Sequence, residues 1–262
     1  MREASPARPS SLRPLWGVAL FVRDGWGILL LIVAWQAWVV AMNFNQIVMP
    51  RPMGVLRDLV SAPDVYWSNA VWTIVAAIGG LVLGMLLGTT LAVVAWLSAI
   101  LEGLLTPITI LFSSVPVVTV IPIVARLLGY DFTTVLAIVV IICFFPAFVF
   151  TTSGLRALPP GSADLFAVLG ARTKARLFRL ALPAAVPNWT VALRVAAGHA
   201  VLGAMVAEYL MGTAGLGYLF AETKADFNMD RAFGATVVAM AVSMAFFAVA
   251  LAVERWVKQR WS

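Results

Sequence analysis

Side chains able to carry out covalent or metal chemistry are scarce in this chain of 262 residues. His199 is the only histidine and Cys143 the only cysteine, so neither a two-histidine zinc helix nor a thiolate metal cluster can form. No Gly-x-Ser-x-Gly segment supplies a serine nucleophile, and no lysine follows a glycine as in a phosphate-binding Gly-Lys-Ser/Thr loop. We therefore expect a protein that is not an enzyme, with no catalytic residue, metal or cofactor of its own.

Two ionisable side chains could instead belong to a path across a membrane. His199 and Glu208 are nine residues apart in one apolar run, which puts them on opposite faces of a helix and about 13 Å apart along its axis. This geometry argues against a proton relay between them. For His199 two interpretations stay open: contact with a transported solute, or a neutral, hydrogen-bonded position inside the protein.

The composition is that of a membrane protein. Hydrophobic residues make up 62% of the chain and charged residues 11%, and the mean hydropathy is +0.97. The chain therefore has more apolar side chains than a soluble core of this length could bury. The 18 basic residues outnumber the 12 acidic ones, but they lie between apolar runs and indicate topology, not a nucleic-acid partner. The lipid bilayer is the expected partner of the apolar surface.

Apolar runs of about 20 residues, the length that crosses a bilayer, predict an all-α polytopic fold with six transmembrane helices. These helices are expected at about 25–42, 68–96, 102–127, 132–152, 188–210 and 234–256. The third contains three prolines, Pro107, Pro116 and Pro122. Each proline removes a backbone donor, so this helix is predicted to be either kinked or broken.

The basic residues also predict the orientation. We divide the chain into a polar tail (1–24), a transmembrane domain (25–256) with a long loop at about 153–187, and a short end (257–262). Twelve basic residues lie in the tail, in the long loop and around the C-terminus, against five in the loops on the other side. By the positive-inside rule, both termini and the long loop are expected in the cytoplasm.

The second predicted helix carries a strip of small residues. Gly80, Gly84 and Gly88 recur every fourth residue, so one face of the helix is nearly bare backbone and lets another helix approach closely. The strip is expected to pack either against a helix of the same chain or against a second subunit.

The long loop contains a basic segment with helical periodicity. Arg172, Arg176 and Arg179 fall on one face of a short helix, and Phe178 falls on another. Gly170 can adopt a positive φ and would let two short helices, about 160–169 and 172–181, meet at an angle. Pro183 and Pro187 are then expected to end this unit and to start the next span. From composition alone, an interfacial helix on anionic lipid is the favoured interpretation.

The spacing within the segment "DLFAVLGARTKARLFRLALP" resembles the cytoplasmic signature of permease subunits of ATP-binding-cassette importers. Gly170, Leu180, Leu182 and Pro183 match its frame, and Asp164 stands where the family usually has glutamate. The resemblance implies that this loop couples the permease to an ATPase. The coupling residues that it implies are Asp164, Gly170, Arg172, Lys174, Arg176, Phe178, Leu182 and Pro183.

Further segments are similar to the nitrate, sulfonate, taurine and pyrimidine-precursor branch of such permeases. They are "MPRPMGVLRDL", "SSVPVVTVIPIVARLLGYD", "FFPAFVFTTSGL" and "AEYLMGTAGLGYLF". An arginine often seen early in the second helix of the branch is absent, and Thr73 and Ile74 stand there instead. Its absence weakens the inference of an anionic substrate.

The resemblance implies a type I ABC importer permease in a bacterial inner membrane. Its expected partners are a second permease copy forming a homodimer, two ATPase subunits that hold ATP and Mg²⁺, and an extracytoplasmic solute-binding protein. Gly212, Gly215, Leu216 and Gly217 are expected to contact the binding protein. The residues expected along the solute path are Ser113, Ser114, Thr119, His199 and Glu208. An ion-coupled carrier or channel is the alternative, but it would need ionisable groups at mid-depth.

Overall fold

The computed structural model describes residues 13–113 and 115–261, and within these ranges the chain is helical with no strand. In chain order the α-helices are α1 (Arg13–Ala41), α2 (Pro52–Ser61), α3 (Pro63–Leu97), α4 (Ala99–Ser113), α5 (Val117–Leu128), α6 (Phe132–Arg156), α7 (Ser162–Val168), α8 (Thr173–Arg176), α9 (Leu182–Met211), α10 (Leu216–Ala225) and α11 (Met229–Trp261). A π-helical turn, Leu177–Ala181, joins α8 to α9. The all-α class predicted from the sequence is confirmed.

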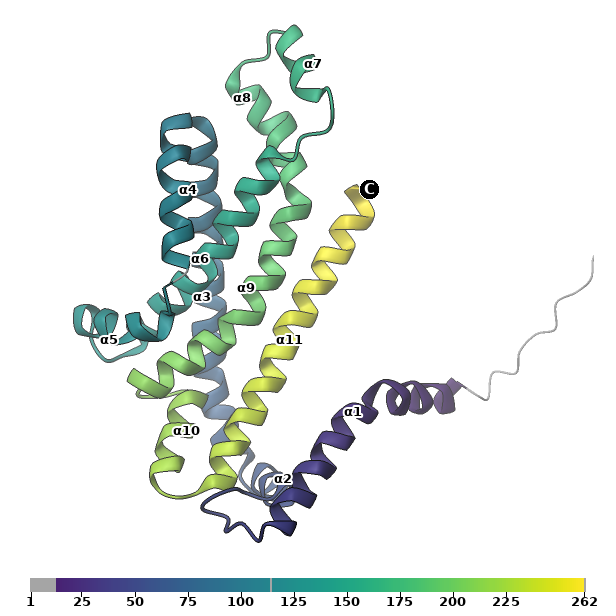
Figure 1. Ribbon diagram of the computed structural model, residues 1–262, viewed down its shortest axis with the longest axis vertical. Coiled ribbons are helices and arrows are strands. Elements are labelled where there is room, and N and C mark those ends of the chain that lie inside the picture. Colours follow the sequence, from purple (N-terminus) through teal and green to yellow (C-terminus); the bar gives the residue numbers. More distant parts are fainter. Residues whose placement is uncertain (1–12, 114, 262) are drawn as a thin grey trace, which may run out of the picture.

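Four helical segments in the described part of the chain are long and apolar enough to cross a membrane: α3, α6, the segment Thr173–Met211 that ends in α9, and α11. They run side by side through the length of the molecule (Figure 1). The short helices α7 and α8 lie at one end of this bundle, and α2 and α10 lie at the other (Figure 1). We call the first the α7 end and the second the α10 end.

The glycine strip of α3 packs against α6 within the same chain. A Cβ atom added to Gly80 would lie 2.4 Å from the Cβ of Val139, and one added to Gly84 would lie 2.6 Å from the Cβ of Cys143. Gly88 is equally close to α6. Of the two packing partners considered for this strip, the structure therefore shows the helix of the same chain.

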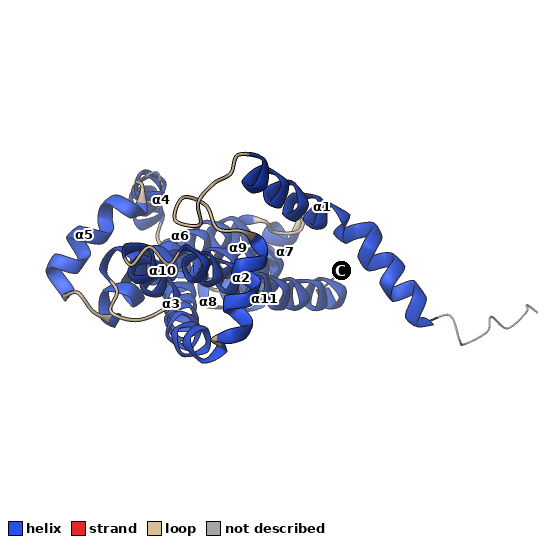
Figure 2. Ribbon diagram, turned by 90° about the horizontal axis from the view of Figure 1, so that it is seen from below, coloured by secondary structure: helices blue, strands red, loops and turns tan. Residues whose placement is uncertain are grey.

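The third predicted span is broken, not kinked. It consists of α4 and α5, and Pro116 occupies the position before α5 in an extended conformation. At about 1.5 Å per residue, the 15 residues of α4 and the 12 of α5 are each too short for a hydrocarbon core of about 30 Å. Seen from below, α5 projects from the bundle on the side opposite α1 (Figure 2).

The first predicted span forms part of a longer helix that leans away from the bundle. Helix α1 begins at Arg13 and not near residue 25, and its apolar part is Trp26–Ala41. Contacts with the rest of the chain lie near its C-terminal half, where the ring centroids of Trp35 and Phe233 are 5.7 Å apart and Val39 is buried. The apolar part coincides with the predicted span at about 25–42.

Pro183 starts the next span as predicted, but it does not interrupt the helix before it. Helix continues from Thr173 to Met211, and Pro183 lies in the first turn of α9. The preceding turn is π-helical, with the Leu182 N–H bonded to the Leu177 carbonyl. A π turn widens the backbone, so the proline ring is accommodated without ending the helix. The basic segment is thus rigidly continuous with a membrane-spanning helix.

Candidate functional site

The loop at the α7 end exposes large apolar side chains at one end of the bundle. Leu165, Val168 and Leu169, which we call the apolar tip, are 57%, 87% and 70% exposed. Phe178 is also exposed, at 66%. A group of large apolar side chains outside a membrane span is typical of a protein contact surface. Asp164 lies in the first turn of α7 beside this tip.

Gly170 ends α7 in a Schellman motif. Its φ is +63°, its N–H donates to the Ala167 carbonyl at 3.0 Å, and the Ala171 N–H donates to the Phe166 carbonyl at 2.9 Å. A Cβ atom added at Gly170 would meet nothing within 4 Å. The glycine is therefore needed for its backbone conformation and not for space.

The base of the loop is fixed to the helix bundle. Leu177 and Ala181 are buried in a cluster with Leu155 of α6 and Ala185 of α9. Of the basic residues predicted to couple, Arg172 and Lys174 are exposed and Arg176 is half-buried, as are Leu182 and Pro183. A displacement of the tip would therefore be passed to two membrane-spanning helices as a rigid body.

Two ion-pair groups connect helices toward the same end of the bundle. Arg194 of α9 donates from Nε to Glu254 of α11 at 2.5 Å, and Lys258 binds the other carboxylate oxygen at 2.7 Å. Glu102 at the start of α4 pairs with Arg156 at the end of α6. The first group ties α9 to α11, and the second ties α4 to α6.

At the α10 end, Glu208 holds a turn rich in glycine. Its Oε2 accepts from the Thr73 hydroxyl at 2.8 Å and from the Gly217 N–H at 3.0 Å. Thr73 in turn accepts from the Leu216 N–H at 2.9 Å, and Asn69 accepts from the Gly215 N–H at 3.1 Å. Glu208 is 2% exposed. We call this arrangement the glycine-turn clasp.

The clasp requires glycines. Gly215 has a φ of +106°, and a Cβ there would lie 2.2 Å from the carboxyl carbon of Glu208. A Cβ on Gly217 would lie 2.0 Å from the Met205 carbonyl oxygen. Leu216 is 0% exposed and Gly217 is buried, so neither lies at the surface in this conformation, and their contact with a binding protein stays a prediction. The exposed member of the turn is Thr213.

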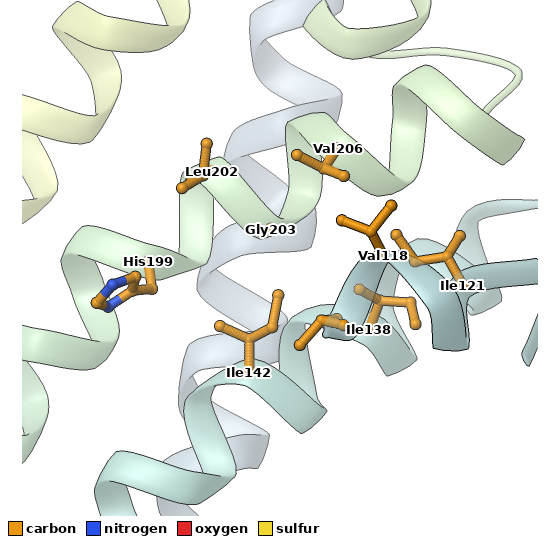
Figure 3. Close-up of a pocket in the computed structure, with 9 residues that line it drawn as sticks. Val118, Ile121, Ile138, Ile142, His199, Leu202, Gly203 and Val206 are labelled. Atoms are coloured by element: carbon orange, nitrogen blue, oxygen red, sulfur yellow. The ribbon is translucent and has the colours of Figure 1, made fainter. Parts of the chain in front are cut away.

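His199 lies at a cavity of about 220 Å³. Side chains of α5, α6 and α9 converge on this space, with His199 and Ile121 at opposite ends (Figure 3). The lining is otherwise aliphatic, namely Val117, Val118, Ile121, Ile138, Ile142, Leu202, Gly203 and Val206. His199 Nδ1 is 2.8 Å from the Val195 carbonyl oxygen, so Nδ1 carries hydrogen and Nε2 is left for another partner. We call this space the histidine cavity.

Of the other residues expected along the path, the two whose side chains the structure describes, Thr119 and Glu208, do not line the histidine cavity. Thr119 donates its hydroxyl to the Pro116 carbonyl at 2.7 Å, the backbone bond that such residues commonly form within spans. The side chain of Ser113 and the whole of Ser114 lie outside the described residues. Glu208 lines a separate cavity of about 410 Å³ at the α10 end.

An ion pair between distant residues ties α2 to α11. Arg231 donates from Nε and Nη2 to the two carboxylate oxygens of Asp58, both at 3.2 Å, and the Tyr66 hydroxyl donates to the same carboxylate. Burial raises the pKa of Asp58, but its hydrogen bonds to Arg231 and Tyr66 outweigh this effect and hold that pKa below its ordinary value. Sequence reasoning missed this pair because its members are 173 residues apart.

We expect the Asp58 pair to stabilise the fold above about pH 4 and to lose its effect below that pH. The sign follows from the lowered pKa, because a carboxylate that is harder to protonate when folded stabilises the folded state until it is protonated. Asp58→Asn should lower the free energy of unfolding by about 1–2 kcal/mol at pH 7. Thermal unfolding of the purified protein from pH 7 to pH 3 measures the difference, which should shrink as the pH falls. A difference independent of pH, or an equal one for the exposed Asp226→Asn, would contradict this account.

Comparisons with known proteins find one family and several of its members that are similar to this chain. The family described as "Binding-protein-dependent transport system inner membrane component" matches residues 69–262, which include most of α3 and everything after it. A probable ABC transporter permease protein of Haemophilus influenzae is 28% identical over 221 residues, covering 84% of this chain and 89% of the relative. The formylaminopyrimidine transport permease protein ThiX of Halalkalibacterium halodurans is 29% identical over 192 residues, covering 72% of this chain and 76% of the relative.

A third relative is the putative aliphatic sulfonates transport permease protein SsuC of Bacillus subtilis, 26% identical over 224 residues and covering 82% of this chain and 81% of that one. Among solved structures, an inward-facing conformation of the MetNI methionine ABC transporter contains a similar chain. The TM-score is 0.59 at 18% identity, and the match covers 74% of this chain and 94% of the other. This likeness confirms the type I permease fold.

Proposed function

Because this chain belongs to the family of binding-protein-dependent transport system inner membrane components, and is thus a permease subunit of an ABC importer, we propose that its α7–α8 loop is where an ATPase subunit drives transport. ATP and Mg²⁺ would bind to that partner, since this sequence lacks a Gly-Lys-Ser/Thr loop. The permease itself would do no covalent chemistry. Closure of the ATPase would move the loop, and with it α6 and α9.

The observation that carries this proposal is the apolar tip on a fixed base. Val168 is 87% exposed, whereas Leu177 at the base is 5% exposed. The exposed apolar tip can fit into a cleft of another protein. Exposed Arg172 and Lys174 can pair with acidic groups at the rim of that cleft. Lipid could also cover such a tip, but the tip stands beyond the ends of the membrane-spanning helices (Figure 1).

The orientation follows from charge. The α7 end carries the basic loop and the basic C-terminal residues, so we place it in the cytoplasm, with the α10 end facing the solute-binding protein. Thr213, Glu222 and Asp226 are exposed at that end. The N-terminus is expected in the cytoplasm as well.

The permease would act as a dimer of identical chains with two ATPase subunits. His199 is exposed in the single chain, and an imidazole facing lipid is costly. A second copy across the faces of α5 and α9 would enclose the histidine cavity and turn it into part of a solute path. The solute is expected to be a small molecule: a sulfonate, nitrate, an aromatic acid or a pyrimidine precursor. The names of the relatives include a pyrimidine and sulfonates.

Co-purification tests the docking role of the tip. A tagged permease solubilised from its native membrane is expected to retain an ATPase subunit, and the double variant Val168→Asp, Leu169→Asp should retain at least about tenfold less, as for loss of an interface hot spot. Val60→Asp, at an equally exposed apolar side chain of α2 (81%), is the matched control. Purification of the permease without an ATPase would favour a channel or an ion-coupled carrier and overturn the proposal.

A further inference from the structure

We infer that the cavity at the α10 end is a selective binding site for a planar aromatic solute that is positively charged or rich in N–H donors. Its volume is about 410 Å³, within the range of sites for small ligands. The lining residues are Trp72, Asp131, Phe132, Val135, Glu208, Thr213 and Ala214, which we call the outer pocket. The inference rests on the proposed transport function, and it disfavours the anionic solutes named there.

Two aromatic rings give the outer pocket a surface for a flat solute. The rings of Trp72 on α3 and Phe132 on α6 have centroids 5.9 Å apart and meet at 62°, edge to face. Trp72 is 50% exposed, so part of its indole face is free. An indole face attracts a planar cation more strongly than other aromatic rings do, through its ring quadrupole.

The charged groups of the outer pocket are carboxylates. Asp131 is exposed and caps α6, with Oδ1 accepting from the Thr133 N–H at 2.9 Å; Oδ2 is not needed for that cap. Glu208 is 2% exposed, and the two bonds of the clasp both use its Oε2. No lysine or arginine is among the lining residues of this pocket. An oxyanion there would meet the exposed Asp131 carboxylate without a compensating cation, whereas a cation or an N–H donor would meet acceptor oxygens.

The next cavity along α6 has the same preference. Val135 of the outer pocket and Ile138 and Ile142 of the histidine cavity are three and seven residues apart, so they share one face of α6. At the second cavity His199 already donates from Nδ1 to a backbone carbonyl. With Nδ1 as the donor, Nε2 is the ring atom left to accept a solute N–H. A solute moving along this face would thus meet acceptors and apolar surface in turn.

Three probes of one shape and different charge test the inference. Benzamidine is a cation, benzamide is neutral and benzoate is an anion. Their dissociation constants for the full chain in lipid nanodiscs can be measured by calorimetry. We expect benzamidine to bind about tenfold more tightly than benzamide, and benzoate to bind most weakly.

Asp131→Asn is the decisive variant. Asparagine caps a helix about as well as aspartate, so the melting temperature should be retained while benzamidine affinity falls about tenfold and benzamide affinity stays. Asp226→Asn, which removes an exposed charge outside the pocket, is the matched control and should leave both affinities unchanged.

Several outcomes would overturn the inference: equal affinity for the three probes, tightest binding of benzoate, no binding of benzamidine, or unchanged benzamidine affinity in Asp131→Asn. The assay contains no ATPase, so it is independent of the co-purification test. Loss of the charge preference with normal ATPase recovery would reject the solute class alone. Failure to recover an ATPase would reject the proposed function, whatever the probes show.

Discussion

Gly170→Val is expected to uncouple ATP hydrolysis from transport while leaving the helix bundle folded. Gly170 has a φ of +63°, and a residue with a Cβ pays about 1–2 kcal/mol in this left-handed region. A penalty of that size changes the population of the loop conformation by about 5–30-fold. The coupled rate, measured as solute-stimulated ATP hydrolysis by the reconstituted transporter, should fall by a similar factor.

The matched variant Gly170→Asn separates conformation from bulk. Asparagine tolerates the left-handed region, and a Cβ at this position meets no atom within 4 Å. Gly170→Asn should therefore retain most of the coupled rate. Equal rates for the valine and asparagine variants would show that the Schellman turn is not part of the coupling.

Glu208→Ala should give the largest loss of stability, about 3–5 kcal/mol. The change leaves the Gly217 N–H and the Thr73 hydroxyl without the acceptor that they share, and both are buried. Glu208→Gln keeps one acceptor oxygen, so its free energy of unfolding should fall by less. Thermal unfolding in detergent measures the difference, and proteolysis near the glycine turn reports on local opening.

Glu222→Ala is the control for this prediction. Glu222 is exposed, and its partner in the described part of the chain is the Tyr218 hydroxyl at 3.2 Å. A surface change of this kind is expected within about 0.5 kcal/mol of the wild type. If Glu208→Ala were as stable as Glu222→Ala, the glycine-turn clasp would not stabilise the fold and this prediction would be wrong.

Hydropathy predicted much of the fold. The spans at 68–96, 132–152, 188–210 and 234–256 all fall inside long helices, because about 20 apolar residues have few other stable arrangements in lipid. The prolines of the third span correctly marked an irregular segment. Whether it was kinked or broken depended on how α4 and α5 pack, which local sequence does not encode.

Pro183 shows where local rules failed. A proline inside a helix removes one bond and clashes with the preceding turn, so a stop was the natural expectation. The π turn at Leu177–Ala181 relieves that clash, and burial of Leu177 and Ala181 holds the turn in place. Tertiary packing therefore overrode the local signal.

The sequence predicted the α7–α8 loop better than it predicted the α10 end. Gly170 was identified because a Schellman turn depends on a single local glycine. The clasp joins Asn69, Thr73 and Glu208 across more than 130 residues, and the outer pocket brings Trp72 beside Phe132 from different helices. Contacts between distant segments depend on helix packing, so residue types alone pointed to Glu208 without revealing its partners.

Cross-linking from the apolar tip tests the central claim most directly. Cys143, the only native cysteine, is buried, so a photo-reactive maleimide should label Val168→Cys selectively. In native membranes, illumination is expected to link the labelled permease to its ATPase subunit, with no such product from Val60→Cys at the other end of the bundle. An ATPase linked from position 60, or none linked from position 168, would contradict the account.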